Sequence, residues 1–327
     1  MRYPLLTITG FYLIATAAQA EIPVLTVHTY DSFVAEWGPG PMIETAFEAD
    51  CACDLQFVSS GDGAALLARI LLEGPQTDAD VVVGLDNNLT HRALGSGLFA
   101  PHGVTTPLAL PVDWADPVFL PYDWGWFAFV GHAGSAMPED FQALADSDLT
   151  IVIQDPRSST PGLGLLMWVK QAYGDQAGGI WAGLADNIVT VTPGWSEAYG
   201  LFLAGEADLV LSYTTSPAYH LIVEGDAGKV ALPFAEGHPL QIELAAKLAG
   251  TDQPDLADRF MAFLVSPGVQ SILPTTNWMY PATALAEGLP DGFGSLIQPE
   301  QTLLLDGAQV DELRDPALEE WRSALAP

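Results

Sequence analysis

Three short segments place hydroxyl and acidic side chains where a strand should end and a helix should begin. They are Ser59–Gly63, Asp155–Gly162 and Tyr213–Pro217. Free N–H groups at a helix start, together with Ser or Thr hydroxyls, favour binding of a phosphate or a carboxylate. Each segment alone is better explained as an ordinary helix cap. Because ligands of open α/β sheets bind beyond the carboxyl ends of the strands, the three segments together predict a site that accepts an anion.

Aromatic residues at the ends of elements suggest a second half of this site. The set comprises Trp37, Trp195, Tyr213, Tyr219 and Trp278. Flat aromatic faces suit a ring-bearing ligand, above all a cationic one, and Asp62 could pair with a positive or amino-bearing group. Each aromatic residue could instead be a half-buried packing residue with a polar tip. The remaining tryptophans considered, for which we expect packing roles or a place at a junction between lobes, are Trp114, Trp124, Trp126, Trp168 and Trp181.

The sequence offers little that could support catalysis. It contains no GxSxG, HExxH or phosphate-binding P-loop motif, and no GxGxxG motif after a strand. The six histidines do not cluster. The only cysteines, Cys51 and Cys53, could form a disulfide in an oxidising compartment, and no His or carboxylate partners at metal-ligand spacing lie near them. We therefore expect neither catalytic residues nor a metal site.

Short β-rich runs alternate with helical periods along the chain, which predicts an α/β architecture. The expected strands are Val24–Thr29, Asp80–Val83, Thr150–Ile153, Ile188–Thr192 and Asp208–Ser212, with a polar turn at Leu85–Asn88. Late helices are expected at Pro254–Leu264 and Pro316–Leu325. Two further strands, Trp126–Val130 and Leu240–Ala246, would cross between two lobes. This division puts residues 21–124 with 239–327 in lobe 1 and residues 125–238 in lobe 2.

The first twenty residues predict export. Arg2 precedes an apolar run, and Ala18-Gln19-Ala20 supplies the small-x-small pattern of a signal-peptide cleavage site, so residues 1–20 should be removed. The product should be soluble in the periplasm. The 327-residue chain carries 41 acidic against 10 basic residues, a net charge of −31. Such a charge disfavours nucleic acids and anionic membranes as partners.

Five longer stretches resemble the thiamine-binding periplasmic proteins of bacterial thiamine ABC transporters. They are TVHTYDSFVAEWGPGP from Thr26, ADVVVGLDNNL from Ala79, QDPRSSTPGLGLL from Gln154, GWSEAYGLFLAGEADLVLSYTTSPAYH from Gly194 and NWMYP from Asn277. The stretches occur in family order over nearly the whole chain. The resemblance implies a two-lobed type II periplasmic-binding-protein fold, with a ligand cleft between the lobes.

The resemblance also implies the residues that contact the ligand. The matching positions are Asp62, Gly63, Ser159, Thr160, Trp195, Tyr213, Thr214, Thr215, Ser216 and Pro217, with Tyr219 and Trp278 similar to aromatic residues that line the family cleft. One departure is Ser158-Ser159-Thr160, where the family pattern is Thr-Ser-Thr; the hydroxyls are kept. The implied function is capture of thiamine and its mono- and diphosphate for an importer with permease and ATPase subunits, without a cofactor.

Two other functions fit parts of the sequence. A thiamine-degrading transferase of similar fold would need a nucleophilic cysteine in the cleft, and here the only cysteines lie far in sequence from the aromatic residues. A binding protein for iron, a polyamine or an organophosphonate is the other alternative. Iron sites in such folds use Tyr and His ligands, and the Tyr-rich run has no clustered histidines beside it.

Overall fold

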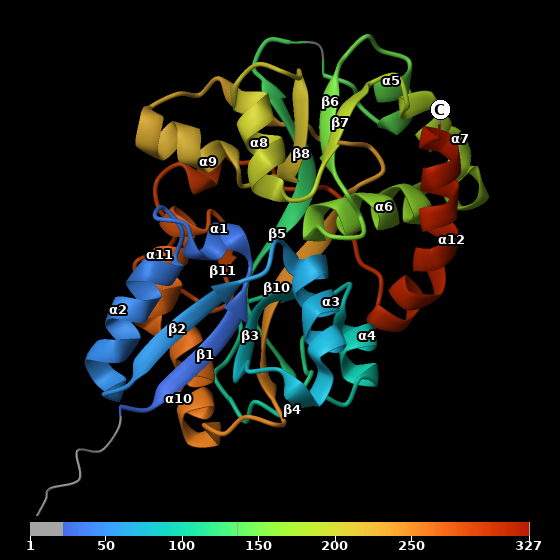
Figure 1. Ribbon diagram of the computed structural model, residues 1–327. Coiled ribbons are helices and arrows are strands. Elements are labelled where there is room, and N and C mark those ends of the chain that lie inside the picture. The colour runs from blue at the N-terminus through green and yellow to red at the C-terminus, as the bar shows by residue number, and fades with distance from the viewer. Residues whose placement is uncertain (1–21, 136, 327) are drawn as a thin grey trace, which may run out of the picture.

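The computed structural model describes residues 22–135 and 137–326 as twelve strands surrounded by helices (Figure 1). The expected signal peptide lies outside the described residues. The strands are β1 (Val24–Thr29), β2 (Asp54–Ser59), β3 (Val81–Asp86), β4 (Phe99–Ala100), β5 (Phe119–His132), β6 (Ile151–Gln154), β7 (Ile188–Thr192), β8 (Leu209–Tyr213), β9 (Lys229–Ala231), β10 (His238–Leu248), β11 (Tyr280–Pro281) and β12 (Thr302–Leu303).

The α-helices differ widely in length and are joined by four short helices of other types. The α-helices are α1 (Asp31–Val34), α2 (Gly40–Cys51), α3 (Gly63–Glu73), α4 (Thr90–Gly95), α5 (Phe141–Ala145), α6 (Thr160–Tyr173), α7 (Ala177–Leu184), α8 (Trp195–Leu203), α9 (Pro217–Tyr219), α10 (Pro254–Leu264), α11 (Pro267–Thr276) and α12 (Gly307–Leu325). The short ones are η1 (Gly74–Gln76), η2 (Gly174–Gln176), η3 (His220–Glu224) and η4 (Phe293–Ser295). No helix in the described part of the chain is both long and apolar enough to span a membrane.

The main path of strands runs in the order β2-β1-β3-β10-β5-β8-β6-β7 and passes through two lobes. Strands β1 to β4 with α2, α3, α4, α10 and α11 form the lower lobe of Figure 1, called lobe 1 here; β6 to β9 with α5 to α8 form lobe 2. Strand β5 joins them, because residues 119–126 pair with β10 and residues 127–130 pair with β8. One continuous strand therefore belongs to the sheets of both lobes.

Alternating side chains fix which helices cover each face of the sheet in lobe 1. Val82 of β3 packs with the apolar side of α3, whereas Val81 and Val83 pack on the other face with residues of α2 and α10. The side chains of all three valines are fully buried. A strand covered on both faces is apolar throughout, as parallel strands between helices must be.

Lobe 2 repeats this arrangement with different helices. Phe129, Ile153 and Leu211 pack towards α6 and α7, and Val152 and Val210 pack on the opposite face with α8. The carboxyl ends of β6 and β8 lead into the starts of α6 and α9 through residues 155–159 and 214–216. These ends face lobe 1, so the loops that could bind a ligand lie between the lobes.

The seven predicted strands and the two predicted late helices occur in the structure in the predicted order, with two corrections to their bounds; strands β2, β4, β9, β11 and β12 were not predicted. Residues Leu85 and Asp86, expected in a turn, end strand β3, because they continue the pairing with β10. The last helix begins at Gly307 and not at Pro316: Asp306 and Gln309 form a capping box that starts the helix two turns earlier. The predicted strands Val24–Thr29 and Ile188–Thr192 and the helix Pro254–Leu264 match in both bounds.

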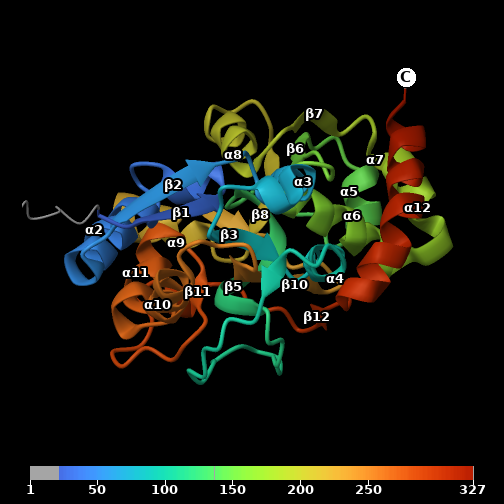
Figure 2. The same cartoon turned by 60° about the horizontal axis from the view of Figure 1, so that its bottom comes forward.

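Helix α12 contacts both lobes. It packs along α6 and α7 and also reaches α4, as Figure 2 shows at the red end of the chain. Val310, Leu318 and Trp321 supply its buried side. The sequence division assigned this helix to lobe 1, and the residue boundaries of the lobes stay a prediction.

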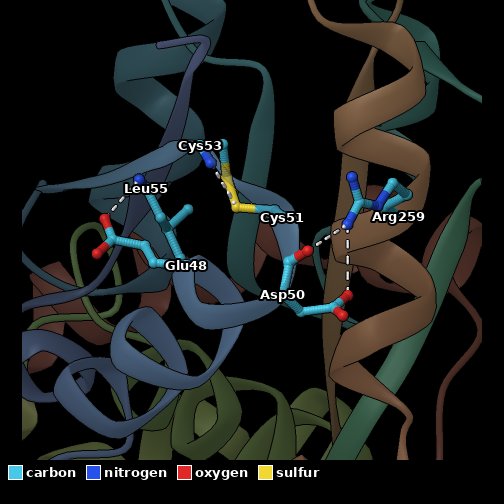
Figure 3. The surroundings of a disulfide bond; sticks show 6 residues. All are labelled: Glu48, Asp50, Cys51, Cys53, Leu55 and Arg259. Atoms are coloured by element: carbon cyan, nitrogen blue, oxygen red, sulfur yellow. Dashed lines mark hydrogen bonds and ion pairs between the residues drawn. A yellow bond between two sulfur atoms is a disulfide. The ribbon is translucent and has the colours of Figure 1, made fainter.

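Cys51 and Cys53 are joined by a disulfide at the far end of lobe 1 (Figure 3). The bond spans the end of α2 and the start of β2, and Ala52 between them has φ +52°, in the left-handed region. Close by, Asp50 Oδ2 and Arg259 Nη2 lie 3.3 Å apart and connect α2 to α10. Both cysteines of the sequence are therefore used in one structural bond.

Candidate functional site

Two helix starts from opposite lobes meet at Asp62 and Ser159. Asp62 is the N-cap of α3 and accepts a hydrogen bond from the Gly63 N–H at 2.8 Å. Ser159, the N-cap of α6, donates its hydroxyl to Asp62 Oδ2 at 2.7 Å. A backbone bond of 2.9 Å from Ala65 N–H to the Ser158 carbonyl also crosses between the lobes. The two lobes are thus in direct contact at residues expected to bind the ligand.

Gly63 permits this contact because it has no side chain. A Cβ added at Gly63 would lie 2.2 Å from Thr160 Oγ1 and 2.7 Å from the Gly84 carbonyl oxygen. The second neighbour is backbone and cannot rotate away. Any larger residue must separate α3 from α6, so glycine at this position sets how closely the lobes approach.

The Asp62 carboxylate lies at the starts of two helices of lobe 2. Burial raises its pKa, and hydrogen bonds from the Ser159 hydroxyl and from the N–H groups of Gly63, Trp195 and Thr160 partly offset the rise. Thr160 and Trp195 are the first residues of α6 and α8. Because such helix ends attract negative charge, Asp62 occupies a position suited to an anionic group.

Trp195 offers an aromatic face at the same junction. Its indole Nε1 donates to Ser212 Oγ at 2.8 Å, and its ring stacks on Tyr199 with centroids 4.9 Å apart. Trp37 of lobe 1 lies 6.2 Å away, centroid to centroid, and is half exposed. The hydrogen bond and the stacking fix the orientation of Trp195 between the lobes.

The run from Tyr213 to Pro217 starts at the last residue of β8, ends at the first residue of α9 and is largely buried. Thr214 and Thr215 are fully buried; Thr215 Oγ1 contacts Met279 Sδ at 3.7 Å. Ser216 Oγ lies 2.7 Å from Ser212 Oγ. The serine and Thr215 hydroxyls are therefore used within the protein, whereas Thr214 Oγ1 is buried without a hydrogen-bond partner.

Tyr219 and Trp278 form a second aromatic contact between the lobes. Their ring centroids are 5.3 Å apart in an edge-to-face arrangement. Trp278 follows the end of α11 and has φ +57°, which is uncommon for a bulky residue. Such backbone strain is often found where a side chain is held for a function. The structure thus brings together Asp62, Gly63, Ser159, Thr160 and Trp195, and separately Tyr219 and Trp278.

A group of residues that the sequence analysis did not identify lies where β5 and β10 run side by side. Glu243 accepts hydrogen bonds from the phenol of Tyr122 and, at 2.9 Å, from that of Tyr30. The Asn277 amide donates to Asp123 Oδ2 at 2.7 Å. Tyr122 has no partner in the register and forms a bulge, which lets it and Asp123 both reach towards Glu243.

Asp86 adds a third carboxylate beside this group. It pairs opposite Glu243 across β3 and β10, as Asp123 does across β5 and β10. We call Asp86, Glu243 and Asp123 the carboxylate row. Their exposed fractions are 0%, 8% and 0%. Burial raises the pKa of all three, that of Asp86 to about 7.

A sequence signal for the row exists. Asp123 and Glu243 each stand as the single acidic residue inside a mostly apolar strand, in LPYDWGWF and LQIELAAK. Carboxylates are rarely buried in strands unless they are paired or bind something.

One cluster elsewhere has the composition of a metal site. The ligand atoms of His28, Glu73 and Asp78 lie within 4.8 Å of one another. Each is already engaged: His28 Nε2 lies 2.9 Å from Asp78 Oδ1, and Glu73 accepts from Arg69 and Thr77. Arg69 balances the charge of Glu73, and Asp78 is hydrogen-bonded to His28, so each carboxylate of this cluster has a partner within the protein.

Comparison with known sequences gives consistent results. The model of the family described as bacterial extracellular solute-binding protein matches residues 43–276. The thiamine-binding periplasmic protein of Escherichia coli (strain K12) is 50% identical over 319 residues, which covers 96% of this chain and 97% of that protein. A protein of the same name from Brucella melitensis is 49% identical, with 98% of each chain covered.

Solved structures extend the comparison to the fold. A structure titled periplasmic thiamin binding protein has a TM-score of 0.91 and 50% identity, and covers 94% of this chain and 97% of that chain. The ferric binding protein from Campylobacter jejuni has a TM-score of 0.73 at 17% identity, which shows a similar fold alone. The two-lobed fold expected from the sequence is confirmed.

Proposed function

The chain belongs to the bacterial extracellular solute-binding proteins and, within them, to the thiamine-binding periplasmic proteins, and on this premise we propose that it binds thiamine between its lobes as the solute-binding component of an ABC importer. The family is periplasmic, as the signal-like N-terminus predicts. Its members are binding proteins, and thiamine is the transported ligand, not a cofactor.

The observation that carries this proposal is the meeting of three helix starts from two lobes. Asp62 and Gly63 at α3 contact Ser159 and Thr160 at α6, and Trp195 at α8 lies beside them. All five residues were selected from the sequence. A site divided in this way can close on a ligand, and a transporter can then recognise the closed form.

The chemistry of thiamine suits these groups. Its two aromatic rings can lie against Trp195 and the Tyr219–Trp278 pair, and its thiazolium ring carries a positive charge that favours aromatic faces and carboxylates. Asp62 can accept a hydrogen bond from the amino group of the pyrimidine ring. Permease and ATPase subunits would be the partners in transport.

For the phosphate esters, we infer that the phosphate binds at the starts of α6 and α8. There it would replace the Asp62 carboxylate as the group facing the helix N–H groups and the Ser159 hydroxyl. Free thiamine leaves Asp62 in place. Asp62→Asn keeps a good N-cap for α3 and removes a negative charge, so it should shift preference towards the phosphate esters.

A transferase function has less support in this chain. A nucleophile must be a free thiolate in the site, and both cysteines are consumed by the disulfide at the far end of lobe 1.

Calorimetry with thiamine and its mono- and diphosphate tests the proposal. Trp195→Ala and Tyr213→Ala should each weaken thiamine binding by more than about tenfold, or roughly 1.4 kcal/mol. Trp114→Ala, a half-buried tryptophan away from these helix starts, is the matched control and should leave the affinity unchanged. Absence of heat and of thermal stabilisation with every thiamine species would overturn the proposed function.

A further inference from the structure

The carboxylate row is an unusual arrangement for the middle of a sheet. Asp86, Glu243 and Asp123 stand opposite one another on three neighbouring strands, and like charges placed directly opposite destabilise a sheet. Among residues 22–135 and 137–326, no ion pair joins Lys, Arg or His to any of the three. The described protein therefore supplies no positive side chain that would balance ionised carboxylates in the row.

Hydrogen-bond donors surround the row but do not satisfy it. Tyr30, Tyr122, Gln241 and Asn277 donate to Glu243 or Asp123. Even so, Asp86 Oδ2, Asp123 Oδ1 and Gln241 Oε1 are buried acceptors with no partner in the described structure. Buried acceptors without donors are rare in folded proteins, and each calls for an explanation.

The row lies directly behind the residues expected to contact the ligand. The Thr160 hydroxyl interacts with the Asp86 carboxylate and lowers its pKa, and Asn277, which donates a hydrogen bond to Asp123, precedes Trp278 in the chain. The titratable groups that face the row are Tyr30, Tyr122, Tyr213 and Asp62. Glu243, Asp62, Asp86 and Asp123 all raise the pKa of Tyr213, after burial, so their negative potential extends to the end of β8.

We propose that the carboxylate row is the cation subsite of this protein: it supplies the negative potential that selects an organic cation over a neutral molecule of the same shape. The inference rests on the proposed function, in which the cation is the thiazolium ring of thiamine. In a buried site of low dielectric, three carboxylates attract a cation far more strongly than they would in water.

Binding of the cation should release a proton from the carboxyl groups of the row. Without a ligand, burial favours protonated carboxyl groups in the row. A bound cation favours their ionised form, so binding releases a proton from the row to the solvent and the total charge of the site is conserved. Affinity for the cation should therefore rise with pH through the range in which the row titrates.

The test compares thiamine with a neutral isostere in which carbon replaces the charged ring nitrogen. The wild-type protein should bind thiamine at least about tenfold more tightly than the isostere. Glu243→Gln and Asp123→Asn should remove most of this difference by weakening thiamine alone. Glu236→Gln, which alters a carboxylate bonded to Tyr173 in lobe 2, is the matched control and should keep the difference.

Calorimetry in buffers of different ionisation enthalpy supplies the second readout. Thiamine should release up to about one proton from the wild-type protein, and fewer from either variant, whereas the isostere should release none. A role in packing alone would weaken both ligands equally and leave proton release unchanged.

The outcomes separate this inference from the proposed function. Equal affinity of the wild-type protein for thiamine and the isostere overturns the cation subsite and leaves thiamine binding intact. If neither compound binds but choline or a polyamine does, and Glu243→Gln abolishes that binding, thiamine is the wrong ligand and the subsite stands. Failure of every cation to bind overturns both.

Discussion

Two clusters of acidic side chains on the sheet of lobe 1 invite comparison. In the cluster of His28, Glu73 and Asp78, every carboxylate is paired, and Arg69 supplies positive charge. In the carboxylate row, the acids are more deeply buried, no basic residue is paired with them, and two carboxylate oxygens have no donor. The first cluster has the residue types of a metal site, and the second has the electrostatics of a binding site.

The difference teaches that residue type is a weaker guide to function than unbalanced charge. A carboxylate that is exposed or paired costs the fold little, whereas a buried one without a partner costs stability. The row is kept next to the contact between the lobes, where a cationic ligand can compensate it. The four predictions that follow test this contrast.

The largest effect should appear when one substitution in each cluster is compared by the pH dependence of the unfolding free energy. The pKa of Asp86 is raised from 3.8 to about 7, so the folded protein holds a proton that the unfolded chain has lost. Stability from this group is complete below pH 3.8 and is lost as the pH rises through 7. Asp86→Asn should flatten the fall in unfolding free energy between about pH 4 and 7, by up to about 1.4 kcal/mol per pH unit.

Urea denaturation of the ligand-free protein at a series of pH values measures this slope. Asp78→Asn, in the His28 cluster, is the comparison variant and should change the slope much less, because it acts only through the lowered pKa of His28. If the two variants flatten the curve equally, the contrast between the clusters disappears.

Gly63→Ala should show how closure of the lobes affects ligand affinity independently of the charge of the row. The added Cβ would meet Thr160 Oγ1 and the Gly84 carbonyl, and overpacking of this kind costs about 2 kcal/mol. We expect thiamine and its neutral isostere to bind roughly thirtyfold more weakly, with their ratio unchanged. Gly95→Ala, with open space around the position, is the matched control. A selective loss of thiamine would mean that Gly63 acts on charge and not on closure.

Removing the disulfide should lower stability without altering recognition. For a loop as short as Cys51 to Cys53, the chain-entropy relation gives a loss of about 1.5 kcal/mol in unfolding free energy. The double substitution Cys51→Ser, Cys53→Ser should leave thiamine affinity and cation preference as in the wild type, measured by calorimetry well below the melting temperature. A loss of preference here would show that selectivity follows general stability, not the row.

The smallest effect is expected in the His28 cluster itself. Asp78 is largely exposed, so Asp78→Asn should change the unfolding free energy by no more than about 0.5 kcal/mol. Thiamine affinity should stay the same, and added Zn²⁺ should not raise the melting temperature of the wild-type protein. A clear rise with Zn²⁺ that Asp78→Asn abolishes would make this cluster a metal site after all.

Much of the fold could be predicted from the sequence because its elements follow local patterns. Strands covered on both faces are short apolar runs, and caps such as Ser159 and Asp62 mark helix starts. The same caps belong to the candidate site, so helix-cap patterns in the sequence are sufficient to identify these site residues. The predicted start of α12 is too late because proline favours the first turn of a helix, whereas Pro316 lies inside this one. The capping box at Asp306 marks the true start.

The carboxylate row could not be predicted in this way because it is a product of topology. Asp86, Asp123 and Glu243 are separated by 37 and 120 residues in the sequence (123 − 86 and 243 − 123) and become neighbours only through the pairing of β3, β10 and β5. Pairing between distant strands has no local signature. A single acid in an apolar strand is a hint, but the partner strand decides whether it is balanced.

The place of β10 between β3 and β5 also determines the order in which the chain can fold. Until residues 238–248 have left the ribosome, β3 and β5 each lack the neighbour that lies between them. Unpaired strand edges promote aggregation, and long-range pairing slows folding. The sheet that connects the two lobes therefore cannot be completed until most of the chain has been made.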